Sequence, residues 1–349
     1  MARSTRSPLV GVAVVLTAAA LFGTLGPLSR LAYDVGMEPL AFVAWRAAIG
    51  FVATAGFVAW RIARRGERLT WPSGLNRRAR LSLGTAAVMG FVLNLCMFIA
   101  FDRITVALAL LGFYTYPVMV AVANVVLGRE PLDRPRVAAL VLAVAGMVAV
   151  VAAQLDPAAG IRLDLVGVGL AIGAALSQAV FVLLSRSGYR TVPADQAMGV
   201  VLAVTVLCSV LLAVATGATG TLGQPLEAPS VLPLLAFTGL FAAAIPSMLF
   251  LTGIRLVGGT GAGILMLFEP VVGVLLAAWL LSEGLAPIQI VGGLAILAAA
   301  LILQRSAPPG ERMVAAPAVE ADEESEGAAM PISDAAAPIR PARRAEGRP

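Results

Sequence analysis

The amino-acid sequence predicts an all-α integral membrane protein with ten transmembrane helices, arranged as two inverted five-helix repeats. Of its 349 residues, 59% are hydrophobic and 13% are charged, and the mean hydropathy is +0.92. Soluble domains carry about twice that share of charged residues, so the composition suits a bilayer rather than water. The segment 9–30 also aligns without a gap on 165–186. Duplication inside a hydrophobic chain is typical of proteins built from inverted membrane repeats.

A second pair of matching features supports the duplication. Pro117 stands 13 residues before Glu130, and Pro270 stands the same distance before Glu283. In each copy the proline lies in an apolar stretch that ends in a short polar loop at the glutamate. Glu130 and Glu283 are expected to hold these loops or to act as hinges. The simpler interpretation is a carboxylate near a helix N-terminus or paired with a loop arginine.

Ten apolar stretches are long enough to cross about 30 Å of hydrocarbon as helices. The first follows Arg3 and Arg6, lacks a small-residue cleavage site and matches an internal span, so we expect it to stay in the membrane uncleaved. The predicted spans are 9–27, 40–60, 83–101, 106–127, 137–152, 165–185, 197–215, 232–251, 261–281 and 288–303. They divide the chain into a first repeat, 1–153, and a second, inverted repeat, 154–304. The remainder, 305–349, is rich in Ala, Pro and Glu and predicts a disordered cytoplasmic tail.

The arginines predict the orientation, because loops on the cytoplasmic side retain Arg and Lys. Alternate connections and both termini hold most of them, whereas the other connections hold only Arg30, Arg103 and Arg162. We therefore expect a multi-pass protein of the bacterial inner membrane with both termini in the cytoplasm. An odd number of spans per copy would insert the second copy upside down, so the loops after Glu130 and Glu283 would lie on opposite sides.

Several function classes are disfavoured by composition. Every basic residue is an arginine, and most lie in short loops or in the tail, so we expect no nucleic-acid partner. Cys96 and Cys208 lie inside apolar spans, where a free thiol is a small packing residue. With no histidine and no lysine, the chain offers no constellation for a metal, a cofactor or an enzyme's nucleophile and base.

The duplicated ten-span plan and the segments 113–150 and 265–303 resemble the EamA branch of the drug/metabolite transporter superfamily, and the resemblance covers residues 9–303. It implies an inner-membrane carrier with a central cavity between its halves, often an exporter of amino acids, other metabolites or toxic compounds. The first copy departs from the usual loop ending because Pro131 and Asp133 follow Glu130.

Two ionisable residues lie inside predicted spans. An ionised group at the bilayer centre costs on the order of 3 kcal/mol, so Arg46 and Glu269 should face the protein interior or a wet cavity. In one interpretation they neutralise each other, or Arg46 reaches the outer headgroups, and neither touches substrate. In the other, Glu269 takes up and releases a proton as the cavity faces alternate sides. Arg46 then resets Glu269 as a counter-charge or clamps a substrate carboxylate.

Further polar residues and three prolines are weaker candidates. Buried amides and hydroxyls line cavities or bond neighbouring helices, and proline within a span bends it where a moving half needs compliance or leaves a static kink. The candidates for lining the cavity are Trp45, Asn94, Tyr114, Tyr116, Ser177 and Gln178. The hinge candidates are Pro117, Pro246 and Pro270.

These features favour a secondary active transporter, and within that class an exporter, of small metabolites such as amino acids, or of drugs, by alternating access. The alternatives are a membrane-embedded enzyme, for which no nucleophile and base are evident, and a channel, for which no span has a long polar stripe. The expected partners are a small-molecule substrate, the lipid bilayer and protons as the coupling ion. Gly167, Gly169 and Gly173 form a small-residue seam that suits packing within the chain or between the protomers of a homodimer.

Overall fold

The computed structural model describes residues 8–66, 68–70, 75–129, 133–153, 164–281 and 286–305. By its contacts the chain divides into two units, Met1–Met313 and Val314–Pro349, and every described residue belongs to the first. The predictions for the tail and for Glu130 and Glu283 fall outside the described residues.

All regular structure in the described ranges is helical, which confirms the all-α prediction. The helices are α1 (Pro8–Gly23), α2 (Leu25–Asp34), α3 (Pro39–Arg65), α4 (Arg77–Arg103), α5 (Val106–Phe113), α6 (Tyr116–Val126), α7 (Arg134–Ala152), α8 (Leu165–Ser187), α9 (Ala194–Ala215), η1 (Thr219–Gly223), α10 (Gln224–Glu227), η2 (Pro229–Val231), α11 (Leu232–Gly239), the π-helical turn η3 (Leu240–Ala244), α12 (Ile245–Met266), α13 (Glu269–Leu281) and α14 (Pro287–Arg305). Eight helical segments in the described part are long and apolar enough to cross a membrane, and Pro287–Ile302 is a shorter apolar helix. The count of ten spans stays a prediction.

The longest apolar segment, Pro229–Met266, is interrupted at Gly258. A straight helix of its 38 residues would be about 57 Å long, nearly twice the thickness of the hydrocarbon layer. At Gly258 the backbone leaves the helical region with φ 83° and ψ 168°, a conformation open to glycine because it has no Cβ. Residues 245–257 and 259–266 therefore form two helical pieces of different direction.

Three other breaks interrupt apolar segments in their middle. They fall at Thr24 between α1 and α2, at Tyr114 and Thr115 between α5 and α6, and at Leu267 and Phe268 between α12 and α13. The hydroxyls of Thr24 and Thr115 each donate to the carbonyl three residues earlier, at 2.7 Å, and so compete with the backbone hydrogen bonds of the helix.

Two of the three candidate prolines lie where a helix resumes after a break. Pro117 and Pro270 are the second residues of α6 and α13, and proline suits this position because its missing N–H would have no partner in the first turn. Pro246 instead follows the π-helical turn η3 inside a helix that continues without a break. The role of the three prolines as hinges stays a prediction.

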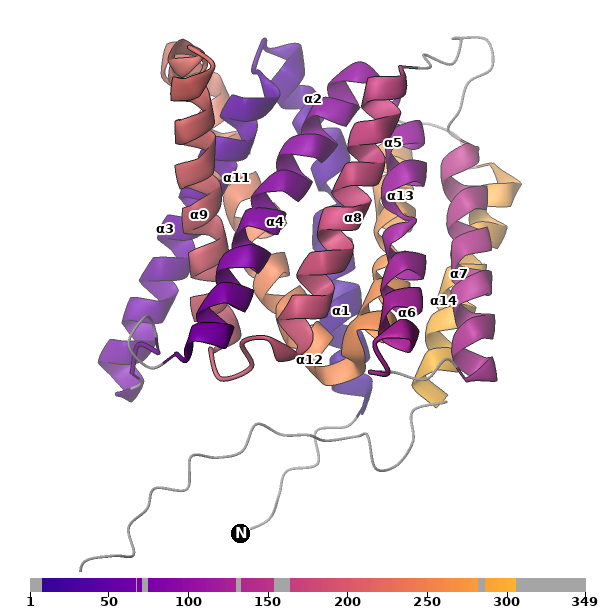
Figure 1. Cartoon of the computed structure of the whole chain (residues 1–349). Coiled ribbons are helices and arrows are strands. Elements are labelled where there is room, and N and C mark those ends of the chain that lie inside the picture. The colour runs from indigo at the N-terminus through magenta and orange to yellow at the C-terminus, as the bar shows by residue number, and fades with distance from the viewer. Residues whose placement is uncertain are drawn as a thin grey trace, which may run out of the picture. The chain divides into compact units, whose positions relative to one another are not determined.

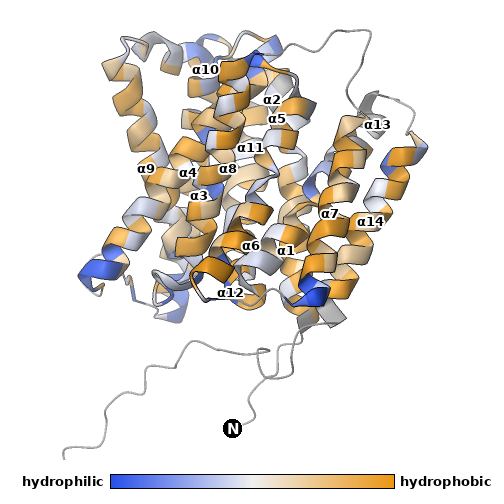
Figure 2. Ribbon diagram, turned by 45° about the vertical axis from the view of Figure 1, so that its right-hand side comes forward, coloured by the Kyte–Doolittle hydropathy of each residue, from blue (hydrophilic) through white to orange (hydrophobic). Residues whose placement is uncertain are grey.

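The most extensive helix pairings join residues 8–153, the first half, to residues 164–305, the second half. They are α1 with α12, α4 with α8, α3 with α9, and α7 with α14. The α7 and α14 helices lie side by side at one edge of the helical array (Figures 1 and 2). The two halves thus share one packed interior.

The α7–α14 pairing depends on two glycines that bring the backbones together. A Cβ added at Gly146 would lie 2.6 Å from the carbonyl oxygen of Gly292, and one added at Gly292 would lie 2.5 Å from the carbonyl oxygen of Gly146. Small residues allow this close approach in membranes, where helix association rests on van der Waals packing rather than on a hydrophobic driving force.

Gly292→Ala is expected to lower the stability of the purified protein by about 1–3 kcal/mol, the usual cost of overpacking. Thermal unfolding in detergent measures the change. Gly169→Ala is the matched control, because nothing lies within 4 Å of a Cβ there and it carries the same gain in helix propensity. Equal midpoints for the two variants would show that the α7–α14 contact tolerates a methyl group.

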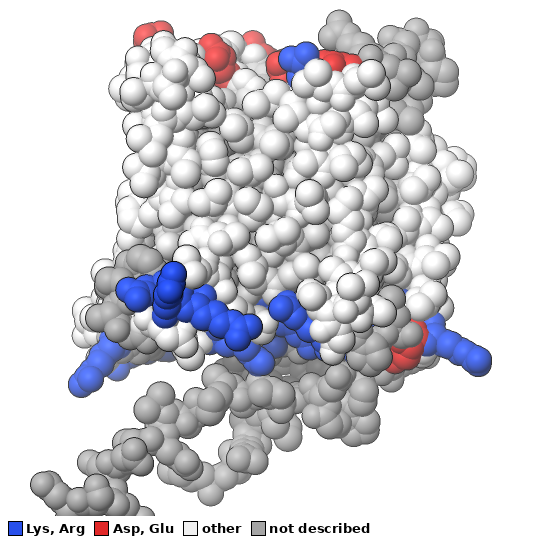
Figure 3. All heavy atoms as spheres, viewed as in Figure 1, with Lys and Arg blue, Asp and Glu red and all other residues white. Residues whose placement is uncertain are grey.

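Charged side chains gather at the two ends of the helices with opposite signs. Figure 3 shows basic residues along the lower end and mostly acidic residues along the upper end of the face in view, while Figure 2 shows apolar residues between them. We name the end where α3 finishes and α4 begins the basic end, and the opposite end the acidic end. The basic end includes Arg61, Arg64, Arg65, Arg77, Arg78 and Arg80, and the acidic end includes Asp34, Glu38, Asp102, Asp164 and Glu227.

An ion pair joins the two halves at each end. At the basic end Arg61 Nη1 lies 2.6 Å from Asp195 Oδ2, and at the acidic end Arg103 Nε lies 2.6 Å from Asp164 Oδ2. Desolvation raises the pKa of Asp164, but hydrogen bonds from the Val166 amide and from Arg103, with the charge of Arg103, outweigh it and leave the pKa below its ordinary value. The Asp164 contact therefore stabilises the fold at neutral pH and is lost as the pH falls through that lowered pKa.

Candidate functional site

Glu269 lies at the break between α12 and α13, as the first residue of α13. Its half-buried carboxylate interacts electrostatically with the hydroxyls of Tyr114 and Tyr116. Tyr114 and Tyr116 flank Thr115 at the break between α5 and α6. The interruption of the second half thus faces the corresponding interruption of the first.

The two tyrosines bring buried polar groups into this region. Each side chain is 1% exposed, and neither hydroxyl makes a hydrogen bond of normal geometry to a described residue, although the Tyr114 hydroxyl lies close to Glu269. Gln178 of α8 is also buried and interacts with the Tyr116 hydroxyl. Leaving a buried hydroxyl unpaired costs about 1–3 kcal/mol, so such groups mark a place where a water or a ligand supplies the missing bond.

The first helix break also meets Glu269. A Cβ at Gly23, the last residue of α1, would lie 2.6 Å from the Glu269 carbonyl oxygen and 3.0 Å from Val272 Cβ. The absence of a side chain at Gly23 therefore lets α1 lie directly on the backbone at the start of α13. We call Gly23, Tyr114, Tyr116, Gln178 and Glu269 the three-break site.

Beyond the three-break site, further contacts hold α6 against α12. A Cβ at Gly263 would lie 3.3 Å from Pro117 Cβ, so the two helices are in close contact there. The amide of Asn124 donates to the Thr260 hydroxyl at 3.1 Å, and both side chains are buried. A hydrogen bond between two buried side chains fixes the position of α6 relative to α12.

Arg46 belongs to a second polar cluster, which joins α3, α4 and η3. The side chain is 5% exposed, and its Nη1 donates to the Ala242 carbonyl at 2.9 Å. Its Nη2 donates to Asn94 Oδ1, and its guanidinium lies over the Phe98 ring, 5.3 Å from the centroid. The Tyr33 hydroxyl interacts electrostatically with Arg46 and, like Arg46 Nε, is buried without a hydrogen-bond partner.

The structure therefore distributes the candidates over two places. Tyr114 and Tyr116 lie near Glu269, Gln178 lies beside Tyr116, and Asn94 binds Arg46. No ion pair joins Arg46 to Glu269 among the described residues, and the roles considered for these two side chains stay predictions.

The other two polar candidates donate to backbone carbonyls. Trp45 Nε1 donates to the Leu222 carbonyl at 2.8 Å, toward the acidic end, and the Ser177 hydroxyl donates to the Gly173 carbonyl of its own helix at 2.9 Å. A role for Trp45 and Ser177 in lining a cavity stays a prediction.

Two residues of these clusters are absent from the sequence candidates. Gly23 is followed by Thr24, Gly26 and Pro27, and such a run of helix-weakening residues inside an apolar span indicates a break. Tyr33 carries no comparable signal, because nothing local to it indicates that Arg46 would be its neighbour.

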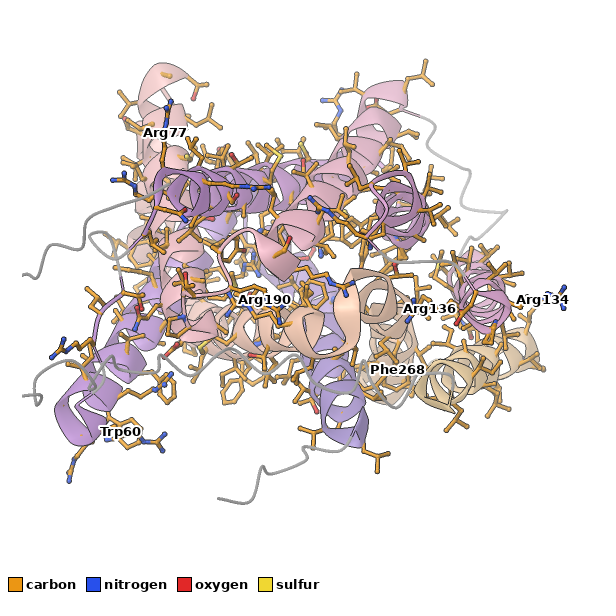
Figure 4. All side chains as sticks on the ribbon, turned by 60° about the horizontal axis from the view of Figure 1, so that its bottom comes forward. Trp60, Arg77, Arg134, Arg136, Arg190 and Phe268 are labelled. Atoms are coloured by element: carbon orange, nitrogen blue, oxygen red, sulfur yellow. The ribbon has the colours of Figure 1, made fainter. Side chains whose placement is uncertain are left out.

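Figure 4 shows the side chains in a view that brings the basic end forward. Phe268 lies among the helices beside α13, whereas Trp60 and Arg134 lie at the periphery (Figure 4). Within the described part of the chain no group of three or more His, Cys, Asp or Glu side chains is arranged to hold a metal ion.

Apolar helices that are broken in mid-span, with buried polar side chains at the breaks, define a multi-pass membrane protein of the transporter class. The chain belongs to the EamA-like transporter family, whose model matches it twice, over residues 9–152 and 165–305. This double match confirms the resemblance seen in the sequence.

Curated relatives and a solved structure agree with this assignment. The chain is 28% identical over 295 residues to the threonine/homoserine exporter RhtA of Escherichia coli strain K12, covering 84% of this chain and 88% of RhtA. The RhtA proteins of Escherichia coli O157:H7 and of strain CFT073 match to the same extent. The chain also shares its fold with a protein of known crystal structure. The TM-score is 0.63, the sequence identity is 21%, and the match covers 84% of this chain and 96% of the other.

Proposed function

We propose that this transporter is a secondary active exporter of small metabolites, amino acids first among them, that works by alternating access in the bacterial inner membrane. The observation that carries the proposal is the meeting of three helix breaks at Glu269, beside two buried tyrosine hydroxyls. Substrate sites in such transporters lie near the bilayer midplane, at discontinuous helices from both repeats.

The helix pairings support an inverted repeat of five spans per half. In this arrangement α1 and α2 together form the first span of the first half, and α8 forms the first span of the second half. Each first span then packs on the third span of the other half, because α1 lies on α12 and α8 lies on α4. The remaining pairs, α3 with α9 and α7 with α14, join second to second and fifth to fifth. A two-fold axis in the membrane plane generates this set of pairings. The opposite charges of the two ends support cytoplasmic termini.

Glu269 is proposed to couple transport to protons. An ionised carboxylate inside a membrane costs on the order of 3 kcal/mol, so it gains stability by binding a proton or a cationic substrate group. A proton and a substrate ammonium therefore compete for Glu269. If the three-break site opens to one side at a time, this competition exchanges one for the other across the membrane.

Arg46 is proposed to bind the carboxylate group of an amino-acid substrate. Threonine and homoserine, the compounds in the name of RhtA, carry an ammonium and a carboxylate. Arg46 uses Nη1 and Nη2 for one protein acceptor each, and a guanidinium has five N–H donors, so donors are left for a ligand. Glu269 and Arg46, which lie in different clusters, thus offer charges of opposite sign to zwitterionic substrates.

Counterflow in proteoliposomes tests the proposed function. Vesicles loaded with unlabelled threonine, homoserine or another amino acid should take up the labelled compound in a saturable manner, and an imposed pH gradient should drive accumulation. Flux that rises linearly with concentration would indicate a channel. Absence of counterflow for every amino acid, with pH-driven movement of a drug panel instead, would reject amino acids as the substrate class.

Arg46→Lys is expected to raise the KM for amino acids about tenfold, because lysine cannot reproduce the planar fork of an arginine hydrogen-bonded to a charged group. The KM for the matching amino-acid amides, which lack the carboxylate, should change little. Arg64→Lys, an exposed change at the basic end, is the control. Unchanged KM values for all these compounds would restrict Arg46 to its contacts with Asn94 and Ala242.

A further inference from the structure

One face of α7, together with the end of α14, forms an open groove of about 680 Å³ on the outside of the helical array. The face is apolar except at its start, where an arginine stands at the basic end. The lining residues are Arg134, Val137, Ala138, Val141, Leu142, Ala145 and Ile302.

The length of the groove matches one leaflet of a bilayer. From Arg134 to Ala145 the helix advances about 16 Å, and half of the hydrocarbon thickness is about 15 Å. With Arg134 at the headgroup level, the groove reaches the middle of the membrane. Val141, halfway along, is 63% exposed, so this face is turned toward lipid rather than toward the protein interior.

Arg134 supplies a positive charge at the mouth of the groove. It is exposed at the periphery and points away from the other helices (Figure 4). The neighbouring Asp133 is engaged by Arg136: its carboxylate accepts from the Arg136 amide at 3.0 Å and lies 3.9 Å from Arg136 Nε. No carboxylate of the described chain is recorded within ion-pair distance of Arg134.

We propose that this groove binds one anionic phospholipid from the leaflet at the basic end. The phosphate contacts Arg134, since a guanidinium suits phosphate oxygens, and an acyl chain lies along Val137, Val141 and Ala145. A second copy of the chain is a poorer occupant. In a two-fold interface centred on this face, Arg134 of both copies would enter the same contact and repel.

Native mass spectrometry of the detergent-purified protein tests the site, with dioleoyl phosphatidylglycerol and dioleoyl phosphatidylcholine as probes. The protein should retain phosphatidylglycerol in preference to phosphatidylcholine. Arg134→Gln should weaken phosphatidylglycerol binding about fivefold, the effect expected for one arginine near an anionic surface, and leave phosphatidylcholine unchanged. Arg64→Gln, an exposed arginine on α3 at the same end, should leave both unchanged.

A second variant tests the acyl part of the site. Ala145→Trp fills the inner end of the groove at an exposed position, so it should weaken both dioleoyl lipids and keep the preference for phosphatidylglycerol. Glycerol phosphate without acyl chains should not displace the bound lipid. Equal phosphatidylglycerol binding by Arg134→Gln and the parent protein would overturn the proposal. Conversion of a dimer to a monomer by Ala145→Trp, with lipid binding unchanged, would also overturn it and assign the groove to a second copy.

Discussion

Replacing Glu269 with glutamine is expected to abolish accumulation driven by a pH gradient and to leave exchange of substrate between equal compartments measurable. Glutamine keeps the shape of the side chain and an oxygen that can accept from a neighbouring hydroxyl, but it cannot gain or lose a proton. Uptake by reconstituted vesicles, measured with and without an imposed pH gradient, separates the two activities. In the parent protein the rate should vary with pH, whereas in the variant it should not.

Glu227→Gln is the control for this experiment, because it makes the same chemical change at an exposed position in α10. It should transport like the parent protein at every pH. Both variants must elute as folded protein in size-exclusion chromatography. Normal pH-driven accumulation by Glu269→Gln would exclude Glu269 as the coupling group and leave the three-break site with a structural or substrate-binding role.

Gly23→Ala is expected to reduce both stability and transport. Its methyl group would lie 2.6 Å from the Glu269 carbonyl oxygen, so the backbone of α1 or α13 must shift. Overpacking of this kind costs about 1–3 kcal/mol in stability. If Glu269 acts on the substrate, a displacement of about 1 Å can lower the transport rate as much as 100-fold, as misplacement does in enzymes. Thermal unfolding in detergent and initial transport rates at matched protein amounts measure the two effects.

Gly26→Ala provides a closely matched comparison. It lies three residues further along the same apolar segment, and nothing lies within 4 Å of a Cβ at this position. It should keep the stability and the transport rate of the parent protein. If Gly23→Ala and Gly26→Ala behaved alike, the contact of α1 with the start of α13 would not matter for the site.

The positions of the proline-linked breaks were predictable, because proline acts locally. Pro117 and Pro270 lack the N–H that a continuous helix needs, so an interruption at each follows from the chain itself. The break at Gly23 and Thr24 had a weaker local signal, and Tyr33 had none. A hydroxyl's neighbour in another helix depends on how the two helices are rotated, which no local rule determines.

The sequence did not predict how each helix is rotated about its own axis. A helix that is hydrophobic all round has no apolar stripe to indicate which face turns inward. The spans of this chain are of that kind, so the periodicity could not tell whether Arg46 and Glu269 face each other. The contacts place Arg46 with Asn94 and Glu269 with Tyr114 and Tyr116.

Sequence by itself determined the membrane class, the duplication and the family of this protein. Hydrophobicity acts through the solvent, and proline acts through the local backbone. The repeat can be found by comparing one part of the sequence with another. These three signals can therefore be interpreted without knowing which helices pack together. Only the tertiary structure decided that α1 packs on α12 and α4 on α8 across the two halves, and that three helix breaks converge at Glu269. These contacts join residues far apart in the chain. The absence of a side chain permits them, at Gly11 and Gly253 where α1 meets α12 and at Gly23 where α1 meets the start of α13.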